Sequence, residues 1–241
     1  MTPGRTDAET LATAIDSVDW PAHLAELGDQ GWTVLPRLLS PARCIDLIAL
    51  EDRGVFRSRI DMARHGYGSG AYGYFDRPLP ETVDALRTGL YPRLLPLADH
   101  WAASAGADPF PPTHAGLLAR CRAAGQTRPT CLLLRYGPGD YNRLHQDRYG
   151  ACVFPLQTAM LLSAPGRDFT GGAFVLTEQR ARMQSRVHVV PLEQGDAVVF
   201  AVDAWPVRTA RGHARVHMRH GVATLTSGSR WTLGVIFHDA A

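Results

Sequence analysis

One stretch near the middle of the chain constrains its fold more than any other. Residues 130–150 read TCLLLRYGPGDYNRLHQDRYG, so an apolar run typical of a β-strand stops at a Gly-Pro-Gly turn and is followed by His145 and Asp147. If the segment after the turn is extended, these two side chains lie at positions i and i+2 and point from the same face of a strand. The stretch therefore predicts two strands joined by a turn, with an imidazole beside a carboxylate.

An imidazole and a carboxylate in this arrangement supply two of the three ligands of a 2-His-1-carboxylate triad, which leaves open positions on Fe(II). His-x-Asp alone is a weak signal, because the tripeptide arises by chance in many chains. A third ligand candidate, His220, lies on a later β-like run, and Arg230 follows it by ten residues. An open Fe(II) site that uses a dicarboxylate co-substrate needs a fixed cation for the distal carboxylate, and arginine binds carboxylates bidentately.

With these residues the chain resembles the Fe(II)/2-oxoglutarate-dependent dioxygenases. The resemblance implies that His145, Asp147 and His220 are the metal ligands and that Arg230 holds the far carboxylate of 2-oxoglutarate. RYGPGDYNRLHQD is also similar to the corresponding segment of the AlkB-type nucleic-acid demethylases, in which the tyrosine at the position of Tyr136 contacts 2-oxoglutarate. The alternative for Tyr136 is a packed aromatic side chain.

A bacterial oxygenase family that is predicted to modify nucleic acids gives the most extensive resemblance. It includes TGGAFVLTEQRARMQSR, QGDAVVFAV and GVIFHDA, and covers most of residues 65–241. Two features depart from the AlkB pattern: Leu134 stands where those proteins have asparagine, and the gap from His220 to Arg230 is shorter, closer to that of prolyl-hydroxylase-like enzymes. The cofactor assignment survives these departures, but a nucleobase substrate does not follow from them.

The resemblance implies Fe(II) as cofactor, 2-oxoglutarate and O2 as co-substrates, and an enzyme that oxidises a substrate C–H bond with release of succinate and CO2. The reaction is then a hydroxylation or, by family resemblance, the oxidative demethylation of a nucleic-acid base. Alternatives stay open: a hydroxylase of a small metabolite or amino acid, a non-catalytic cupin-like metal-binding module, or a structural β-sandwich without metal. The binding module needs His145 and Asp147 but not Arg230.

The pattern along the chain predicts a mainly β fold with a helical N-terminal extension. Residues 1–112 are expected to form this extension with a lid loop, and residues 113–241 a double-stranded β-helix, the jelly-roll plan of cupins, in one integrated domain. Ser40 is expected to cap a helix that starts at Pro41. Turn residues separate eight expected strands, at 130–136, 143–147, 152–162, 173–178, 186–190, 197–202, 215–224 and 230–238.

Glycines, arginines and tyrosines alternate irregularly in residues 54–79. This composition indicates a loop, either a substrate-facing lid or an ordinary surface loop with packed tyrosines. Farther along, Pro92 and Pro96 predict an interruption of the helix that follows.

Several polar residues near the expected site have either a functional or a structural interpretation. His217 is the main rival of His220, but residues three apart on a strand face opposite sides, and the spacing to Arg230 favours His220. Thr232, on the same strand face as Arg230, either adds a hydroxyl for the same carboxylate or is an ordinary β-branched strand residue. Arg135 is expected on the outer face of its strand. Tyr141 and Asn142 either meet substrate or only form the turn.

Composition sets looser limits. A net charge of +2 and a pI near 8.4 do not establish a nucleic-acid partner. Seven arginines lie between residues 180 and 220, against three acidic residues, so this part of the surface suits either a polyanion or plain solvation. The four cysteines form no Cys-x-x-Cys pair, and no apolar leader or membrane-length run is present. We therefore expect a reduced, cytoplasmic protein without a membrane partner.

Overall fold

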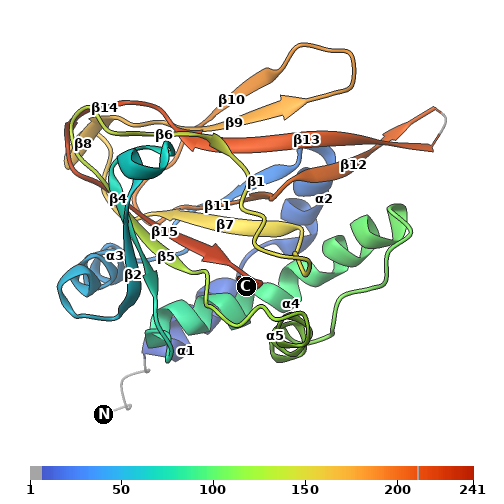
Figure 1. Cartoon of the computed structure of the whole chain (residues 1–241), viewed down its shortest axis with the longest axis horizontal. Helices are drawn as coiled ribbons and strands as arrows, with labels where there is room; N and C mark the ends of the chain where they lie inside the picture. Colours follow the sequence, from blue (N-terminus) through green and yellow to red (C-terminus); the bar gives the residue numbers. More distant parts are fainter. Residues whose placement is uncertain (1–6, 211) are drawn as a thin grey trace.

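Two antiparallel sheets face each other in the computed structural model, which describes residues 7–210 and 212–241 (Figure 1). The sheets place most strands of the second half of the chain around one interior. The larger sheet has the strand order β1 (Trp32–Leu35), β11 (Ala197–Ala201), β7 (Leu156–Leu161), β15 (Arg230–Ile236), β5 (Leu132–Tyr136), β4 (Ala71–Phe75) and β2 (Phe56–Asp61).

The smaller sheet lies above the larger one in Figure 1. Its order is β10 (Arg186–Val190), β9 (Phe174–Gln179), β13 (Gly212–Val222), β6 (Tyr141–His145) and β3 (Gly68–Ser69), and β12 (Ala204–Thr209) pairs only with β13. Because no second strand among the described residues pairs with β12, it is an edge strand, where Pro206 is tolerated. β8 (Phe169–Gly171) and β14 (Leu225–Gly228) form a separate pair.

Helices cover the outer face of the larger sheet, so its central strands are buried on both sides. All residues of β7 and β11 are buried, which explains why β11 is a continuous apolar run and why β7 contains no charged residue. As predicted, Ser40 accepts a hydrogen bond from the Arg43 amide at the start of its helix. The helices are α1 (Asp7–Asp16), α2 (Trp20–Gln30), α3 (Pro41–Ile48), α4 (Glu81–Ser104) and α5 (His114–Ala123), with short 3-10 turns at Ala49–Asp52 and Met62–His65.

The structure corrects the expected interruption near Pro92 and Pro96, because α4 continues through both prolines. The two prolines are one turn apart and both are exposed. The carbonyl groups that lose an amide partner there therefore face solvent, and the opposite side of the helix stays packed on the sheet.

The expectation of an irregular loop over residues 54–79 was also wrong. The segment forms β2, β3 and β4, and β4 pairs with β5 in the larger sheet. Gly73 has a packing role there, because a Cβ atom at this position would lie 2.5 Å from Cδ1 of Phe56. The larger sheet thus contains strands from both sides of residue 112, and the domain boundary proposed at that residue stays a prediction.

None of the helices in the described ranges is long and apolar enough to cross a membrane.

Candidate active site

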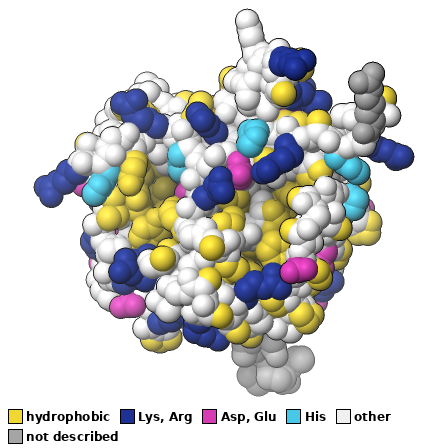
Figure 2. All heavy atoms as spheres, turned by 45° about the vertical axis from the view of Figure 1, so that its right-hand side comes forward, with side chains coloured by type: hydrophobic (Ala, Val, Ile, Leu, Met, Phe, Trp, Pro, Cys, Tyr) yellow, Lys and Arg dark blue, Asp and Glu magenta, His cyan; other side chains and the backbone are white. Residues whose placement is uncertain are grey.

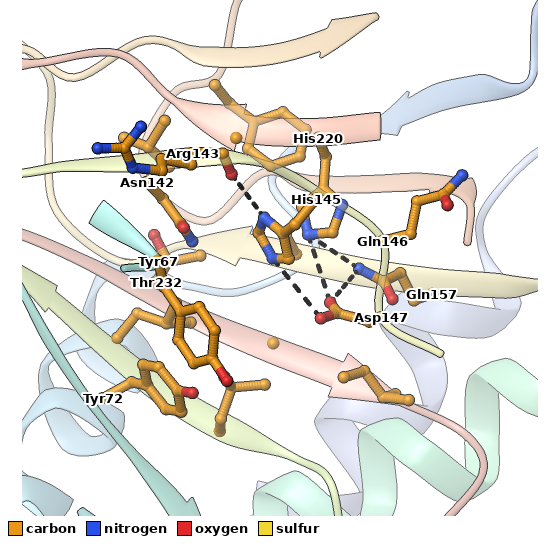
Figure 3. Close-up of a pocket in the computed structure, with 18 of the residues that line it drawn as sticks. Tyr67, Tyr72, Asn142, Arg143, His145, Gln146, Asp147, Gln157, His220 and Thr232 are labelled. Carbon is orange, nitrogen blue, oxygen red and sulfur yellow. Dashed lines mark hydrogen bonds and ion pairs between the residues drawn. The ribbon is translucent and has the colours of Figure 1, made fainter. Parts of the chain in front are cut away.

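A cavity of about 420 Å³ lies between the two sheets and contains most of the side chains singled out in the sequence (Figure 3). Its walls come from β5, β7 and β15 of the larger sheet and from β6 and β13 of the smaller one. Tyr67, Tyr72 and Tyr74, from the segment that was expected to be a loop, line it as well. The fold therefore brings residues separated by more than a hundred positions to one interior.

His145 and His220 face each other because their strands are paired. His145 ends β6 and is the direct partner of His220 on β13, and the two ring centroids are 4.1 Å apart. Nδ1 of His145 donates to the Arg143 carbonyl oxygen at 2.7 Å. This bond fixes the ring so that Nε2 carries the free lone pair, as is usual for a metal-ligating histidine.

Asp147 completes the group from just beyond the end of β6. Its Oδ1 lies 3.6 Å from Nε2 of His145, and its Oδ2 lies 3.3 Å from Nε2 of His220. One ligand atom from each of the three residues can be chosen so that all lie within 4.8 Å of one another. Contrary to the prediction from the sequence, His145 and Asp147 do not lie on one continuous strand, because β6 ends at His145. The segment that follows the strand instead places the Asp147 carboxylate beside the two histidines.

The charges of the three side chains are tightly coupled. Burial raises the pKa of Asp147, but the hydrogen bond from His220 and the two nearby imidazoles outweigh it, so the pKa lies well below its usual range. Burial, together with the charge of His220, lowers the pKa of His145. An ionised carboxylate and a neutral imidazole are the forms that bind a metal ion, and two imidazoles with one carboxylate are the donor set typical of non-haem Fe(II).

Two further side chains hold the Asp147 carboxylate in place. The Tyr149 hydroxyl donates to Oδ1 at 2.7 Å, and the Gln157 amide donates to Oδ2 at 2.9 Å. The Tyr74 hydroxyl in turn donates to that of Tyr149 at 3.1 Å. Burial and the Asp147 charge raise the pKa of Tyr149, so its hydroxyl stays a donor. Partners of this kind orient a ligating carboxylate.

Sequence reasoning missed Tyr149 and Gln157, although each carried a signal. Tyr149 lies two residues after Asp147, and Gln157 is a polar residue inside the apolar run LQTAML. The Gln157 carbonyl oxygen is buried and has no hydrogen-bond partner in the described structure. A polar atom left unsatisfied in this way points to a ligand or water that is bound in the working protein.

Arg230 lines the same cavity, and its charged guanidinium group has no counter-ion among the described residues. It is 1% exposed, and its Nη1 donates to the Thr232 hydroxyl at 2.6 Å. No carboxylate of the described residues pairs with it, and burial lowers its pKa to about 10. The guanidinium group stays charged at neutral pH, so this part of the cavity fits a carboxylate ligand.

Tyr136 packs beside Arg230, with the guanidinium carbon 5.6 Å from the ring centroid. Its hydroxyl accepts a hydrogen bond from the Asn142 amide at 3.3 Å, and burial raises its pKa to about 12. Tyr136, Asn142 and Thr232 all line the cavity, so the structure places the predicted residues together. Their roles toward 2-oxoglutarate stay predictions.

The rival residues lie elsewhere. His217 is half exposed and bonds Asp203 through Nδ1 at 3.1 Å, on the face of β13 opposite to His220. Arg135 is exposed and lies over the Trp231 ring, as expected for the outer face of its strand. As the parity argument predicted, only one of the two histidines lines the cavity, and it is His220, the one that the spacing to Arg230 favoured.

Comparison with known proteins places the chain among oxygenases. Residues 70–240 match the model of a family described as "Oxygenase, catalysing oxidative methylation of damaged DNA". Two curated relatives from strains of Mycobacterium tuberculosis, both named as uncharacterised proteins, are 49% identical over 172 residues, which is 71% of this chain and 74% of each relative.

Solved structures share the fold at low sequence identity. A prolyl-4-hydroxylase of Pseudomonas putida matches with a TM-score of 0.52 and 18% identity, over 92% of this chain and all of that one. An oxidoreductase of the 2OG-Fe(II) oxygenase family from Burkholderia pseudomallei matches with a TM-score of 0.52 and 17% identity, over 93% of this chain and 94% of that one. These matches confirm the predicted jelly roll.

Proposed function

Since the chain belongs to the oxygenase family whose model matches residues 70–240, we propose that it oxidises a nucleic-acid base in the cavity between its two sheets. It is an Fe(II)- and 2-oxoglutarate-dependent dioxygenase. The nucleobase and the roles of the individual residues are the parts we add to that assignment.

One observation carries the residue assignment: a potential metal triad and an unpaired buried arginine share a cavity. A structural ion cluster would supply Arg230 with a carboxylate from the protein. A lone metal-binding module would have no use for a buried cation, which is costly to keep without a partner. A dicarboxylate that binds the metal at one end and Arg230 at the other accounts for both the triad and the buried cation.

Bound Fe(II), 2-oxoglutarate and O2 supply the oxidation of a substrate C–H bond, with release of succinate and CO2. His145, Asp147 and His220 hold the metal ion, while Tyr149 and Gln157 keep the carboxylate turned toward it. Arg230 and Thr232 bind the distal carboxylate of 2-oxoglutarate, and Tyr136 adds a hydroxyl in the same part of the cavity. The protein contributes orientation and electrostatics to chemistry that belongs to the cofactor.

The family description and the aromatic lining of the cavity support a nucleobase. Tyr67, Tyr72 and Tyr149 line the cavity, and flat aromatic rings suit a planar heterocycle. If the oxidised carbon is an N-methyl group, hydroxylation converts N–CH3 into the hemiaminal N–CH2OH. The hemiaminal then breaks down to N–H and formaldehyde. Another oxidised carbon keeps its hydroxyl group.

Anaerobic titration of the apo-protein with Fe(II) and 2-oxoglutarate tests the residue assignment. The parent should develop the weak visible charge-transfer band of the chelate, and His145→Ala should lose it. Arg230→Met should still bind Fe(II), measured by equilibrium dialysis, but need at least tenfold more 2-oxoglutarate. Correctly folded parent protein without a band would contradict the site.

Turnover assays then test the substrate. N-methylated single-stranded oligonucleotides should give formaldehyde and succinate in equal amounts, and their unmethylated counterparts should give no formaldehyde. Free amino acids serve as the small-molecule comparison. Turnover with an amino acid and none with any oligonucleotide would overturn the nucleobase while leaving the dioxygenase in place.

A further inference from the structure

Asp203 lies at the centre of a cluster in which one carboxylate is shared by three cationic or potentially cationic side chains. Oδ1 accepts from Nδ1 of His217 at 3.1 Å, and Oδ2 lies 3.3 Å from Arg148 and 3.7 Å from Arg215. The carboxylate is largely shielded, whereas the side chains of Arg148 and Arg215 are 60% and 70% exposed. The cluster therefore presents guanidinium groups to solvent.

The Asp203 cluster, defined as Arg148, Asp203, Arg215 and His217, is joined directly to the metal-site segment. Gln146, which lies between His145 and Asp147 in sequence and lines the cavity, donates to Asp203 Oδ1 at 2.9 Å. Arg148 follows Asp147. The cluster therefore adjoins the segment that carries His145 and Asp147.

Positive charge dominates this surface. Arg219, two residues from His217 on β13, and Arg143, which lines the cavity, are both exposed, and neither forms an ion pair with an acidic residue in the described part of the chain. Figure 2 shows dark-blue and cyan side chains gathered along the rim of a hollow whose walls are yellow. Two arginines therefore share the Asp203 carboxylate, and that carboxylate is bound more closely by Gln146 and His217 than by either of them.

We propose that the Asp203 cluster binds backbone phosphates of a single-stranded nucleic acid whose target base enters the cavity. The inference rests on the proposed function. Arginine presents a planar fork of donors that matches phosphate, and the loose contacts to Asp203 leave donors of Arg148 and Arg215 available. A base reaches a recessed cavity only when it is out of the helical stack, and a single strand meets this condition without unpairing.

Fluorescence anisotropy with a labelled single-stranded oligonucleotide tests this surface without turnover. The full chain is loaded anaerobically with Fe(II) and 2-oxoglutarate and titrated at several salt concentrations. Arg215→Gln and Arg148→Gln should each weaken binding and lower the slope of log affinity against log salt by about 0.7, the value for one phosphate contact on a single strand. Arg122→Gln, which removes an exposed arginine from α5, is the matched control and should change neither quantity.

A second variant separates phosphate binding from a structural role of the same network. Asp203→Asn removes the competing negative charge and should tighten oligonucleotide binding, whereas a network that only orders the loop would lose affinity when its centre is changed. Weaker binding by Asp203→Asn, or an unchanged salt slope in Arg215→Gln, would overturn the inference. A visible chelate band without oligonucleotide binding would overturn the phosphate-binding inference and leave the dioxygenase assignment standing. A missing band with salt-dependent oligonucleotide binding would overturn the dioxygenase site and leave the phosphate-binding surface standing.

Discussion

Two buried arginines lie near opposite ends of β15, and their surroundings differ sharply. Arg87 donates to the carbonyl oxygens of Ile236 at 2.8 Å and Phe237 at 3.0 Å and pairs with Asp239 at 2.8 Å. Arg230 starts the strand and has one hydroxyl partner, Thr232. Both side chains are at most 1% exposed, so solvent supplies neither of them with the missing contacts.

The difference shows what each group does. The Arg87 cluster, defined as Arg87, His114, Thr130, His238 and Asp239, binds α4 and α5 to the end of the larger sheet with polar groups that the protein itself supplies. Asp239 also pairs with Arg77. Arg230, by contrast, has a charge that only a ligand can neutralise. The buried Arg87–Asp239 pair therefore has a structural role, whereas the unpaired charge of Arg230 indicates a binding site for an anionic ligand.

Asp239→Asn should give the largest effect on stability. The substitution leaves the Arg87 guanidinium buried without a countercharge, and breaking a buried pair in this way costs about 3–5 kcal/mol. Urea denaturation followed by circular dichroism measures the loss. Asp16→Asn, which breaks the exposed pair with Arg93, is the control and should cost below about 1 kcal/mol. Equal losses in the two variants would contradict the role given to the Arg87 cluster.

The histidines of the Arg87 cluster predict a pH dependence of stability. Burial lowers the pKa of both His114 and His238 to about 4, from an ordinary value of 6.5. Between these values the unfolded chain binds protons that the folded chain does not, so the free energy of unfolding falls as the pH drops from about 6.5 towards 4. The two groups together should cost on the order of 3 kcal/mol by pH 5.

Denaturation of the apo-protein between pH 7 and pH 5 measures this dependence, with pH values chosen around the window set by the two pKa values. His114→Gln is the informative variant, because its amide can still donate to the Phe237 carbonyl that His114 contacts. It should remove close to half of the pH dependence. The same slope in variant and parent would show that His114 does not titrate as its burial indicates.

Much of the fold was predictable because its signals are local. The strands after Thr130 follow from apolar runs and turn residues that adjoin them in sequence. β2 and β4 were missed because they pair with each other and Gly73 of β4 is required by its contact with Phe56 of β2, and a single sequence does not contain that pairing. The interruption predicted at the prolines of α4 was wrong for a similar reason. Whether a helix tolerates a proline depends on its exposure in the folded protein, which the sequence alone does not give.

The candidate site divides in the same way. Strand parity, which is a local rule, predicted that only one of His217 and His220 faces the cavity, and the spacing to Arg230 selected His220. Tyr149 and Gln157 were not identified, because their hydrogen bonds to Asp147 depend on how the chain returns from β6 to β7. A sequence therefore predicts the groups that carry the chemistry better than the groups that orient them.

Arg230→Met should give the smallest effect on stability, and its sign distinguishes the two buried arginines. Removing an unpaired buried cation should leave the apo-protein equally stable or stabilise it by about 1 kcal/mol, in contrast to the loss expected when the Arg87 pair is broken. Adding 2-oxoglutarate with Mn(II) should raise the melting temperature of the parent, because a ligand that binds only the folded state stabilises it, and should raise that of the variant less. Differential scanning fluorimetry measures both. A loss of several kcal/mol in the apo variant would mean that Arg230 supports the fold as Arg87 does, and the contrast between the two ends of β15 would fail.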